Sequence, residues 1–266
     1  MAWTRTFAGG APERVNKWLA QTGVCSRREA EAFIAGGLVF IDGERVDDPG
    51  RKIAPGQTLT LSAGAASALA ARTTVVLNKP VGIVSGQPER GQVPAVRLLT
   101  KANAAGGIAA AFSAKALAPV GRLDQDSRGL LILSDDGVLA KAIIAPDSRV
   151  DKEYLVRVEG ALSAKKLALL REGLKLDGRT LKRAVVEEVS PNRLRFVLRE
   201  GRNRQIRRMC GAVDLKVVDL LRIRIGPVRL GDLAEGRWRL LSDKERAALL
   251  EGETGARASK PAEGPS

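Results

Sequence analysis

A polar stretch followed by an apolar run contains the residues best suited to chemistry. Arg122 and Asp124 lie two residues apart in it, shortly before the apolar run Leu130–Leu133. Because that run is short and bounded by turn residues, it is typical of a buried strand, and the loop before it would lie at the mouth of a sheet, where sites are common. The stretch predicts a carboxylate presented on a loop, although a loop aspartate is more often a turn former that hydrogen-bonds its own backbone.

The residue types that are missing limit the chemistry. The chain has no histidine, and its two cysteines, Cys25 and Cys210, lie far apart in sequence. This excludes a His-based triad, a His-ligated zinc and an imidazole base. Acid and base steps must then use carboxylates, Lys, Tyr, Arg or substrate atoms. We find no metal-ligand cluster and no nucleotide-binding glycine loop, so we expect neither a metal nor a cofactor.

Length and charge favour a protein that binds a polyanion. The 266 residues are enough for two domains, and the formal net charge is +14. The charge is uneven: residues 12–61 hold seven basic and seven acidic residues, whereas residues 193–229 hold eleven and three. Such a concentrated field favours nucleic acid, although some basic proteins bind nothing specific. With no membrane-length apolar segment and no apolar signal core, we expect a cytoplasmic monomer without membrane contact.

The first domain is expected at residues 12–61, after a loose tail at residues 1–11. Apolar spacing predicts a helix after Arg14, and Ser26 to Glu29 has the capping-box pattern of a second helix. Asp42-Gly43 predicts a hairpin turn, and a strand is expected at Thr58–Leu61. Two helices and a small sheet would make a compact module.

This module resembles the S4 RNA-binding domain. The similarity lies in the runs Arg14-Val-Asn-Lys-Trp-Leu-Ala, Gly23-Val-Cys-Ser-Arg-Arg-Glu-Ala-Glu and Asp42-Gly-Glu-Arg-Val. In that family the paired helices lie against structured RNA, and the alternative is that these residues are only solvated. The resemblance implies phosphate-contacting roles for Arg14, Lys17, Arg27 and Arg28.

A linker is expected at residues 62–73, a second domain at residues 74–251 and a disordered tail at residues 252–266. Alternating and apolar segments predict a mixed, largely antiparallel sheet with helices, which makes the whole chain α+β. The Ala/Gly-rich stretch 101–116 is expected to be a helix or loop without chemistry. Tyr154, the only tyrosine, shares a strand face with Val156 and Val158, a position usual for a core tyrosine.

A basic segment after Arg199 is expected to be a helix. Ile206, Met209 and Cys210 would face inward, which leaves Arg204 and Arg208 outward. Arg207 would lie beside the apolar face. A half-buried arginine needs a carboxylate, and Asp124 is a candidate partner.

Four segments together resemble one enzyme family. Val120-Gly-Arg-Leu-Asp124, Lys152-Glu-Tyr154, Gly201-Arg-Asn-Arg-Gln-Ile-Arg207-Arg-Met and Leu77-Asn-Lys-Pro-Val-Gly-Ile-Val84 are similar to the pseudouridine synthases of the RsuA/RluB/RluE/RluF branch, which carry an N-terminal S4 domain. The resemblance covers residues 12 to about 250. It implies isomerisation of a uridine within RNA, without redox change or activated phosphate.

Residue roles follow from the resemblance by matching position. Asp124 would be the catalytic carboxylate, Arg122 would assist base extrusion, Tyr154 would stack on the target base, and Arg207 would pair with Asp124 and favour its ionised form. Whether the aspartate attacks the sugar or the base stays open. The RNA-binding residues of this domain would be Lys79, Arg202, Arg204 and Arg208.

The sub-pattern around Asp124 and Tyr154 resembles the RluF type, which acts on large-subunit (23S) ribosomal RNA. Alternatives are a synthase for 16S ribosomal RNA or tRNA, and an RNA-binding ribosome-assembly factor with an idle pocket. A hydrolase using Asp124 and Asp126 is a third possibility. It is disfavoured because carboxylates two apart on one loop seldom face each other across a substrate.

Overall fold

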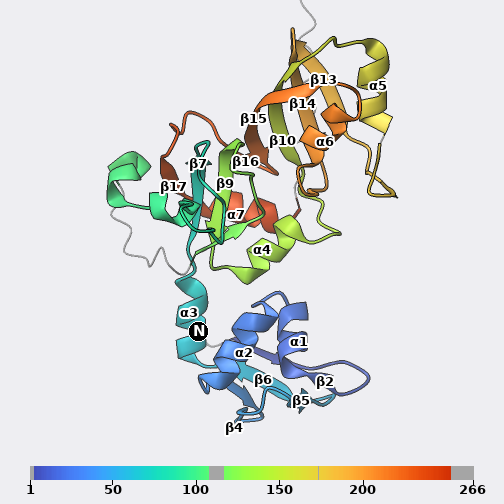
Figure 1. Ribbon diagram of the computed structural model, residues 1–266. Helices are drawn as coiled ribbons and strands as arrows, with labels where there is room; N and C mark the ends of the chain where they lie inside the picture. The colour runs from blue at the N-terminus through green and yellow to red at the C-terminus, as the bar shows by residue number, and fades with distance from the viewer. Residues whose placement is uncertain (1–2, 108–116, 173, 253–266) are drawn as a thin grey trace, which may run out of the picture. The chain divides into compact units, whose positions relative to one another are not determined.

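A computed structural model describes residues 3–107, 117–172 and 174–252 of the chain (Figure 1). Backbone contacts divide the chain into two units. The first comprises Met1–Thr74 together with Ser134–Lys141, and the second comprises Val75–Leu133 together with Ala142–Ser266. The first unit therefore includes a short segment from later in the chain, whereas the sequence predicted a single domain boundary at residues 62–73. Arg72 is one reason, since it pairs with Glu29 and lies 3.5 Å from Asp136.

Two short helices form the apolar layer of the first unit. Helix α1 (Val15–Gln21) buries Val15, Trp18 and Leu19. Helix α2 (Arg27–Ala35) begins at the predicted capping box, in which the Ser26 hydroxyl accepts from the Glu29 N–H and the Glu29 carboxylate accepts from the Ser26 N–H. The cap satisfies backbone donors that would otherwise lack partners, so the helix start is fixed locally.

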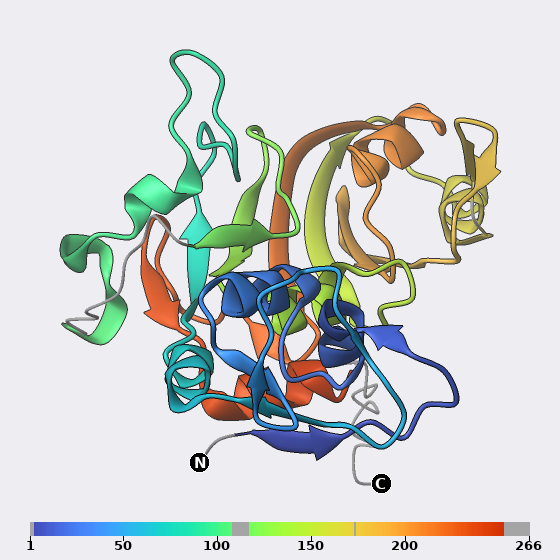
Figure 2. The same cartoon turned by 90° about the horizontal axis from the view of Figure 1, so that it is seen from below.

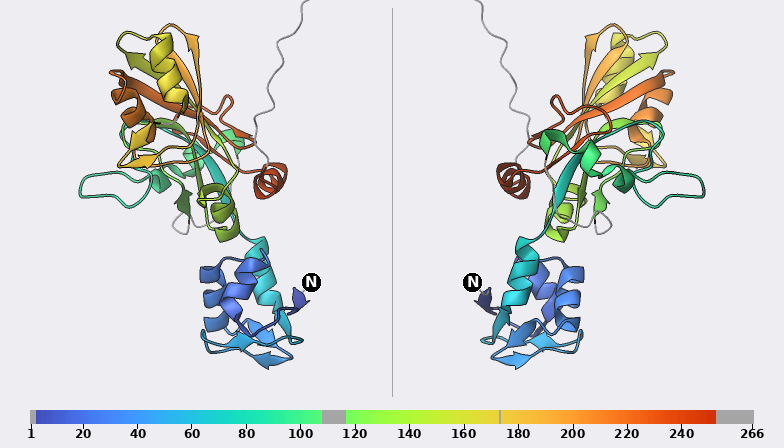
Figure 3. Two further views of the ribbon diagram at one scale, coloured as in Figure 1. Left: turned by 90° about the vertical axis from the view of Figure 1, so that its right-hand side faces the viewer. Right: turned by 90° about the vertical axis from the view of Figure 1, so that its left-hand side faces the viewer.

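The helices lie on one side of a small sheet with strand order β1-β6-β3-β4 (Figure 3). Asp42 and Gly43 both have positive φ in the turn between β3 and β4, as the predicted hairpin requires. Alternate residues of the strands point into a single apolar cluster with the helices. The strand bounds are β1 Thr4–Thr6, β2 Glu13–Arg14, β3 Val39–Ile41, β4 Glu44–Arg45, β5 Lys52–Ile53 and β6 Thr58–Leu61.

The N-terminal segment, expected to be a loose tail, is part of this unit. Strand β1 pairs antiparallel with β6, and Phe7 is buried with its ring edge-on to Trp18 at 5.3 Å between centroids. Burial of an aromatic ring contributes about 2 kcal/mol, which is enough to order a short strand at a sheet edge. The expected linker is also largely ordered, because residues Ala63–Ala70 form helix α3 with Ala65 buried.

The second unit is built on a nine-stranded, largely antiparallel sheet (Figures 1 and 2). Its main path is β13-β14-β10-β15-β9-β7-β17, with β16 beside β15 and β8 beside β9. Strands β15 and β9 pair in parallel within this sheet. The bounds are β7 Thr74–Lys79, β8 Ala118–Val120, β9 Arg128–Ser134, β10 Lys152–Glu159, β13 Val185–Ser190, β14 Arg193–Leu198, β15 Lys216–Ile225, β16 Val228–Arg229 and β17 Trp238–Leu240.

Helices α5 (Ala164–Glu172) and α6 (Gln205–Gly211) lie beside the β10–β14 part of the sheet (Figure 2). Leu170 from α5 and Ile206, Met209 and Cys210 from α6 enter the same apolar cluster as the sheet face. The inward face predicted for α6 is therefore confirmed. Helix α7 (Asp243–Leu250) begins at a capping box formed by Ser242 and Glu245. The remaining elements are α4 (Gly137–Ile144), the hairpin β11–β12 (Lys175–Leu176 and Arg179–Thr180), and 3-10 turns at Ala95–Leu98, Lys101–Asn103 and Ala105–Gly107.

Strand β15 is the centre of the arrangement. It runs unbroken through Arg222, and it lies between β10 and β9. Arg222 is the cross-strand partner of Tyr154 on one side and of Gly129 on the other. Gly129 has φ +104, and a Cβ at this position would lie 2.4 Å from the Arg222 carbonyl oxygen. The close approach of β9 to β15 therefore requires glycine.

Charged side chains are buried at the start of β10. Arg224 lies 2.6 Å from both Asp151 and Glu153, so that ion pair is complete. Lys152 between them is also buried, but its Nζ donates only to the carbonyls of Ile143 and Val150. Burial, reinforced by the charge of Arg222, lowers the pKa of Lys152 to about 8, although Asp151 acts in the opposite direction.

Within the described ranges, no helix is both long and apolar enough to cross a membrane, and no group of three or more Cys, Asp or Glu side chains is placed to hold a metal ion. Residues 108–116 of the Ala/Gly-rich stretch and residues 253–266 of the expected tail lie outside the described residues.

We predict that Gly129→Ala destabilises the protein by roughly 2–4 kcal/mol, because it combines a left-handed backbone with a clash against β15. Denaturant unfolding measures the loss. Gly211→Ala is the matched control, since Gly211 ends α6 with open space around it, and we expect it to be neutral or slightly stabilising. Equal unfolding midpoints for the two variants would contradict the close-packed β9–β15 pairing.

We also predict a pH dependence from Lys152. Between pH 8 and 10.5 the unfolded chain keeps the Lys152 proton while the folded chain loses it, so the lysine's contribution to stability rises with pH. The unfolding free energy of wild type minus that of Lys152→Met should increase by roughly 1 kcal/mol per pH unit over this window. With Lys165→Met, which removes an exposed lysine of α5, the corresponding difference should stay flat. A flat difference for Lys152 as well would refute the lowered pKa.

Candidate functional site

The loop that carries Asp124 joins β8 to β9, and hydrogen bonds hold the residues on each side of Asp124. Ser85 is buried, and its hydroxyl both donates to the Leu123 carbonyl at 2.6 Å and accepts from the Leu123 N–H at 2.8 Å. On the other side of Asp124, the Gln125 carbonyl accepts from the Gly82 N–H at 2.8 Å, and the Gln125 amide donates to the Gly82 carbonyl. Both peptide neighbours of Asp124 are thereby fixed, while its own carboxylate is about 30% exposed.

Arg222 joins the two ends of the same loop. Its Nε donates to the Leu130 carbonyl at 2.7 Å, and its Nη1 donates to the Arg122 carbonyl at 3.2 Å. The guanidinium is buried and lies 5.9 Å from the centre of the Tyr154 ring. One buried cation from β15 therefore connects the residues before and after Asp124 with the tyrosine of β10.

The expected pair between Arg207 and Asp124 is not the arrangement found. The Arg207 guanidinium donates instead to the carbonyls of Asp126 and Val217 and to the Ser127 hydroxyl, at 2.8–3.2 Å. The cation next to Asp124 is Arg204, whose Nη1 lies 3.5 Å from Asp124 Oδ2. The reason is that Arg207, on the inner side of α6, meets the backbone at the end of the loop, whereas Arg204 at the helix start reaches its tip.

Asp126 accepts hydrogen bonds from both guanidinium nitrogens of Arg204. Burial acts to raise the pKa of Asp126, but the hydrogen bond from Arg204 and the charges of Arg207 and Arg204 lower it below its ordinary value. A carboxylate held ionised in this way cannot serve as a proton donor. This geometry argues against the hydrolase alternative, which needs a second carboxyl group as general acid.

Lys79, expected to contact RNA, is fully buried at the end of β7. Its Nζ donates to the carbonyls of Pro80 and Ile83, both at 2.7 Å. Burial and the charge of Arg222 lower the pKa of Lys79 to about 8, while the charges of Asp124 and Asp126 raise it. The RNA-contact expectation is wrong in this structure, because the strand continues through residue 79 and turns the side chain inward. Lys79 instead lies below the Asp124 loop as an internal cation.

Tyr154 and Arg122 differ in accessibility. Tyr154 is 8% exposed and packs in the main apolar cluster, as is usual for a lone strand tyrosine. Arg122 is exposed at the start of the loop, where it is free to meet a ligand. The structure therefore links Tyr154 and the backbone of Arg122 through Arg222, and it brings Arg204 to Asp124.

The outward arginines of α6 and its preceding loop are part-exposed and each has a carboxylate partner. Arg208 binds Asp177 through two nitrogens at 2.6 and 2.9 Å, and Arg202 lies 3.4 Å from Glu200. The outward direction predicted for Arg204 and Arg208 is confirmed. Their charge is partly compensated within the protein, which the composition of the segment did not indicate.

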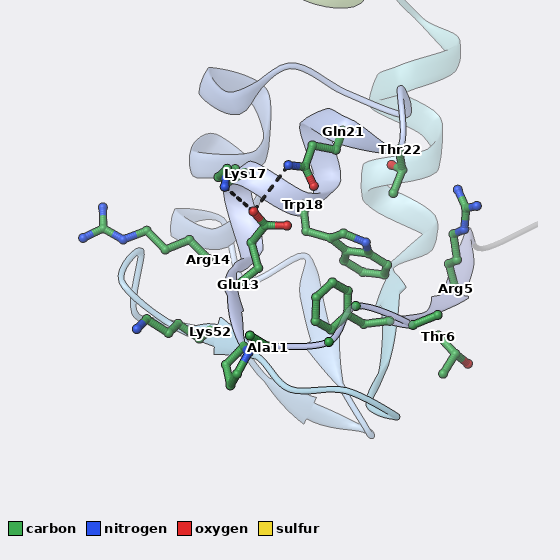
Figure 4. A pocket seen from close by; sticks show the side chains of 15 residues that line it. Arg5, Thr6, Ala11, Glu13, Arg14, Lys17, Trp18, Gln21, Thr22 and Lys52 are labelled. Atoms are coloured by element: carbon green, nitrogen blue, oxygen red, sulfur yellow. Dashed lines mark hydrogen bonds and ion pairs between the residues drawn. The ribbon is translucent and has the colours of Figure 1, made fainter.

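In the first unit, Arg14 and Lys17 line an open groove of about 800 Å³ between the N-terminal segment and α1 (Figure 4). Arg5 and Lys52 line it too, and both are exposed. Glu13, the groove's only carboxylate, is already engaged by Lys17 and Gln21. The groove thus has a net positive lining. Arg27 and Arg28 are exposed in the first turn of α2.

Several of these residues were missed from sequence. Arg222 and Ser85 hold the Asp124 loop through contacts that depend on strand register and loop closure, and no local sequence pattern reveals these. Arg5 and Lys52 line the groove only because β1 folds onto the unit. Asp126 was considered from sequence only as the second carboxylate of a hydrolase, and not as the partner of Arg204. The two cysteines take no part, because burial raises the pKa of both thiols to about 12.

Comparison with known proteins gives two family matches, RNA pseudouridylate synthase over residues 73–212 and the S4 domain over residues 13–59. The chain is 34% identical over 239 residues to the dual-specificity RNA pseudouridine synthase RluF of Escherichia coli (strain K12), covering 89% of this chain and 78% of that protein. It is 35% identical over 243 residues to an uncharacterised RNA pseudouridine synthase of Aquifex aeolicus (strain VF5), covering 89% and 93%. A crystal structure of a pseudouridylate synthase matches with TM-score 0.63 and 28% identity, covering 89% of this chain and 99% of that one.

Proposed function

The chain belongs to the RNA pseudouridylate synthase family, whose members are isomerases, and we propose that it converts a uridine of ribosomal RNA to pseudouridine with Asp124 as its catalytic carboxylate. The observation that carries the proposal is the construction of the loop. Ser85, Gln125 and Arg222 fix the backbone on both sides of Asp124, yet its carboxylate stays part-exposed. Such rigidity is what a group that must meet one reacting atom requires.

The reaction moves one bond. The bond from the ribose C1′ to N1 of uracil breaks, the base turns, and a bond from C1′ to C5 forms. C5 then loses its proton, and N1 gains one. A uridine in folded RNA is out of reach until it leaves its stack, so base flipping comes first. The carboxylate of Asp124 then acts as nucleophile or as base, both of which need its ionised form.

Three neighbours assist this carboxylate. Arg204, 3.5 Å away, offsets the negative charge of Asp124 and so reduces the electrostatic cost of bringing it to RNA. Arg122 is exposed at the loop start, where a guanidinium can fill the space the base vacates and bind phosphate. Tyr154 supplies the aromatic ring against the base, and the buried Arg222 fixes that ring from within.

RNA contacts extend over both units. The groove lined by Arg5, Arg14, Lys17 and Lys52 suits a sugar-phosphate backbone, since its single carboxylate is internally paired. Arg27 and Arg28 add exposed charge at the start of α2. Near α6, Arg202, Arg204 and Arg208 add charge that their carboxylate partners partly compensate. Contacts of this kind supply affinity and orientation rather than sequence choice.

Among RNA substrates we favour large-subunit (23S) ribosomal RNA, on the resemblance of the motifs around Asp124 and Tyr154 to the RluF type. A site in 16S ribosomal RNA or tRNA is the alternative that modification mapping decides. A ribosomal substrate implies action in the cytoplasm, and all residues named here come from one chain, so a monomer suffices.

We predict that Asp124→Asn abolishes modification while RNA binding persists, because the amide keeps the shape of the loop but carries no charge. Pseudouridine is mapped in total ribosomal RNA and tRNA from strains that carry the wild-type gene, no gene or the variant. A site that disappears with both the deletion and the variant identifies the substrate. If modification persists with Asp124→Asn, the catalytic assignment fails. If the deletion changes no site, the chain is an RNA-binding assembly factor.

We predict that RNA affinity falls steeply with salt and that the slope is shallower when groove charges are removed. Each lost phosphate contact should reduce the slope of log K against log[salt] by about 0.7–0.9. Arg5→Ala, Arg14→Ala and Lys52→Ala test the groove, and Arg202, Arg204 and Arg208 changed together to Ala test the α6 surface. Arg45→Ala, exposed on β4 outside the groove, is the control of equal charge. An unchanged slope would move the RNA elsewhere on the protein.

A further inference from the structure

Two carboxylates and two arginines form a cluster between the Asp124 loop and α6. Arg204 holds Asp126 with both guanidinium nitrogens, at 3.1 Å from Nη1 to Oδ1 and 2.9 Å from Nη2 to Oδ2. Arg207 adds a hydrogen bond of 2.8 Å to the Asp126 carbonyl and lies 3.3 Å from Asp126 Oδ1. Asp126 is therefore the carboxylate that both arginines share.

One nitrogen links this cluster to Asp124. Nη1 of Arg204 is 3.1 Å from Asp126 and 3.5 Å from Asp124 Oδ2, so it serves both carboxylates. A two-point contact fixes the plane of a guanidinium, whereas a single long contact does not. The position of Arg204 beside Asp124 is thus determined by Asp126.

The backbone of Arg204 supports this assignment. Arg204 stands before the first turn of α6 with φ 47° and ψ 33°, the left-handed conformation. For an arginine this conformation costs about 1 kcal/mol and persists only where other contacts impose it. The two hydrogen bonds to Asp126 are contacts of this kind, and they direct the Arg204 side chain across the loop.

Building on the proposed function, we propose that Asp126 is a positioning residue for the isomerisation. It binds Arg204 and Arg207, sets the Arg204 guanidinium against Asp124 and does not itself touch the uridine. A second carboxylate at an RNA-facing site weakens attraction for phosphates, so RNA affinity cannot be its purpose. Its effect should be on the rate of the chemical step.

The test is single-turnover pseudouridine formation, with enzyme in excess, on ribosomal RNA purified from the deletion strain. Asp126→Asn should lower the rate constant at saturating enzyme by about tenfold to a hundredfold, because Arg204 loses its anchor. The dissociation constant for RNA should stay within about twofold or tighten. Misfolding would reduce the amplitude of the reaction, whereas a displaced Arg204 reduces its rate constant.

Two further variants separate positioning from general stability. Asp126→Glu keeps a carboxylate that can hold two nitrogens, so it should restore most of the rate. Asp177→Asn is the matched control, because it removes the two-nitrogen contact to Arg208 on the same helix and asparagine tolerates the positive φ of that turn. The control should stay within about twofold of wild type.

A double variant tests whether Asp126 acts through Arg204. If it does, Asp126→Asn combined with Arg204→Gln should be no more than about twofold slower than the slower single variant. Multiplied losses, a rate for Asp126→Asn within twofold of wild type, or a loss confined to RNA affinity would each overturn the inference. Activity retained by Asp124→Asn in the same assay would instead overturn the proposed function, so the two failures are distinguishable.

Discussion

A buried guanidinium needs acceptors inside the protein, and the two carbonyls that Arg222 finds for its Nε and Nη1 shape the site, while its buried Nη2 has no hydrogen-bond partner among the described residues. From the middle of β15 it binds the carbonyls of Arg122 and Leu130 and lies against the ring of Tyr154. Its strand can reach β9 only because Gly129 has no side chain. The position of the Asp124 loop thus depends on one cation in the sheet and one glycine beside it.

The electrostatics around the loop have two layers. Lys79, Lys152 and Arg222 are buried, and backbone carbonyls are their hydrogen-bond acceptors. Internal cations of this kind attract an incoming polyanion. The outer layer consists of Arg204, Arg207 and Arg208, which lie near Asp126 or Asp177. The eleven basic residues of segment 193–229 therefore overstate the charge that is free to meet RNA.

Local signals were sufficient for much of the fold. The capping box at Ser26 and the Asp42-Gly43 turn act within a few residues, so the sequence predicted them correctly. The inward face of α6 follows from spacing alone and was also correct. The first residues were misjudged because the order of β1 comes from Phe7 packing on the distant Trp18 and from pairing with β6.

By itself the sequence determined the family, through four motifs and the S4 domain, and it determined which residue types could act, since a chain without histidine leaves the work to carboxylates and arginines. The tertiary structure decided the pairing. Arg204 rather than Arg207 meets Asp124, Lys79 turns inward, and Arg222 holds the loop. Helical spacing places arginines on a face but does not say how far the neighbouring loop reaches, because that distance depends on the register of β15 with β9 and β10.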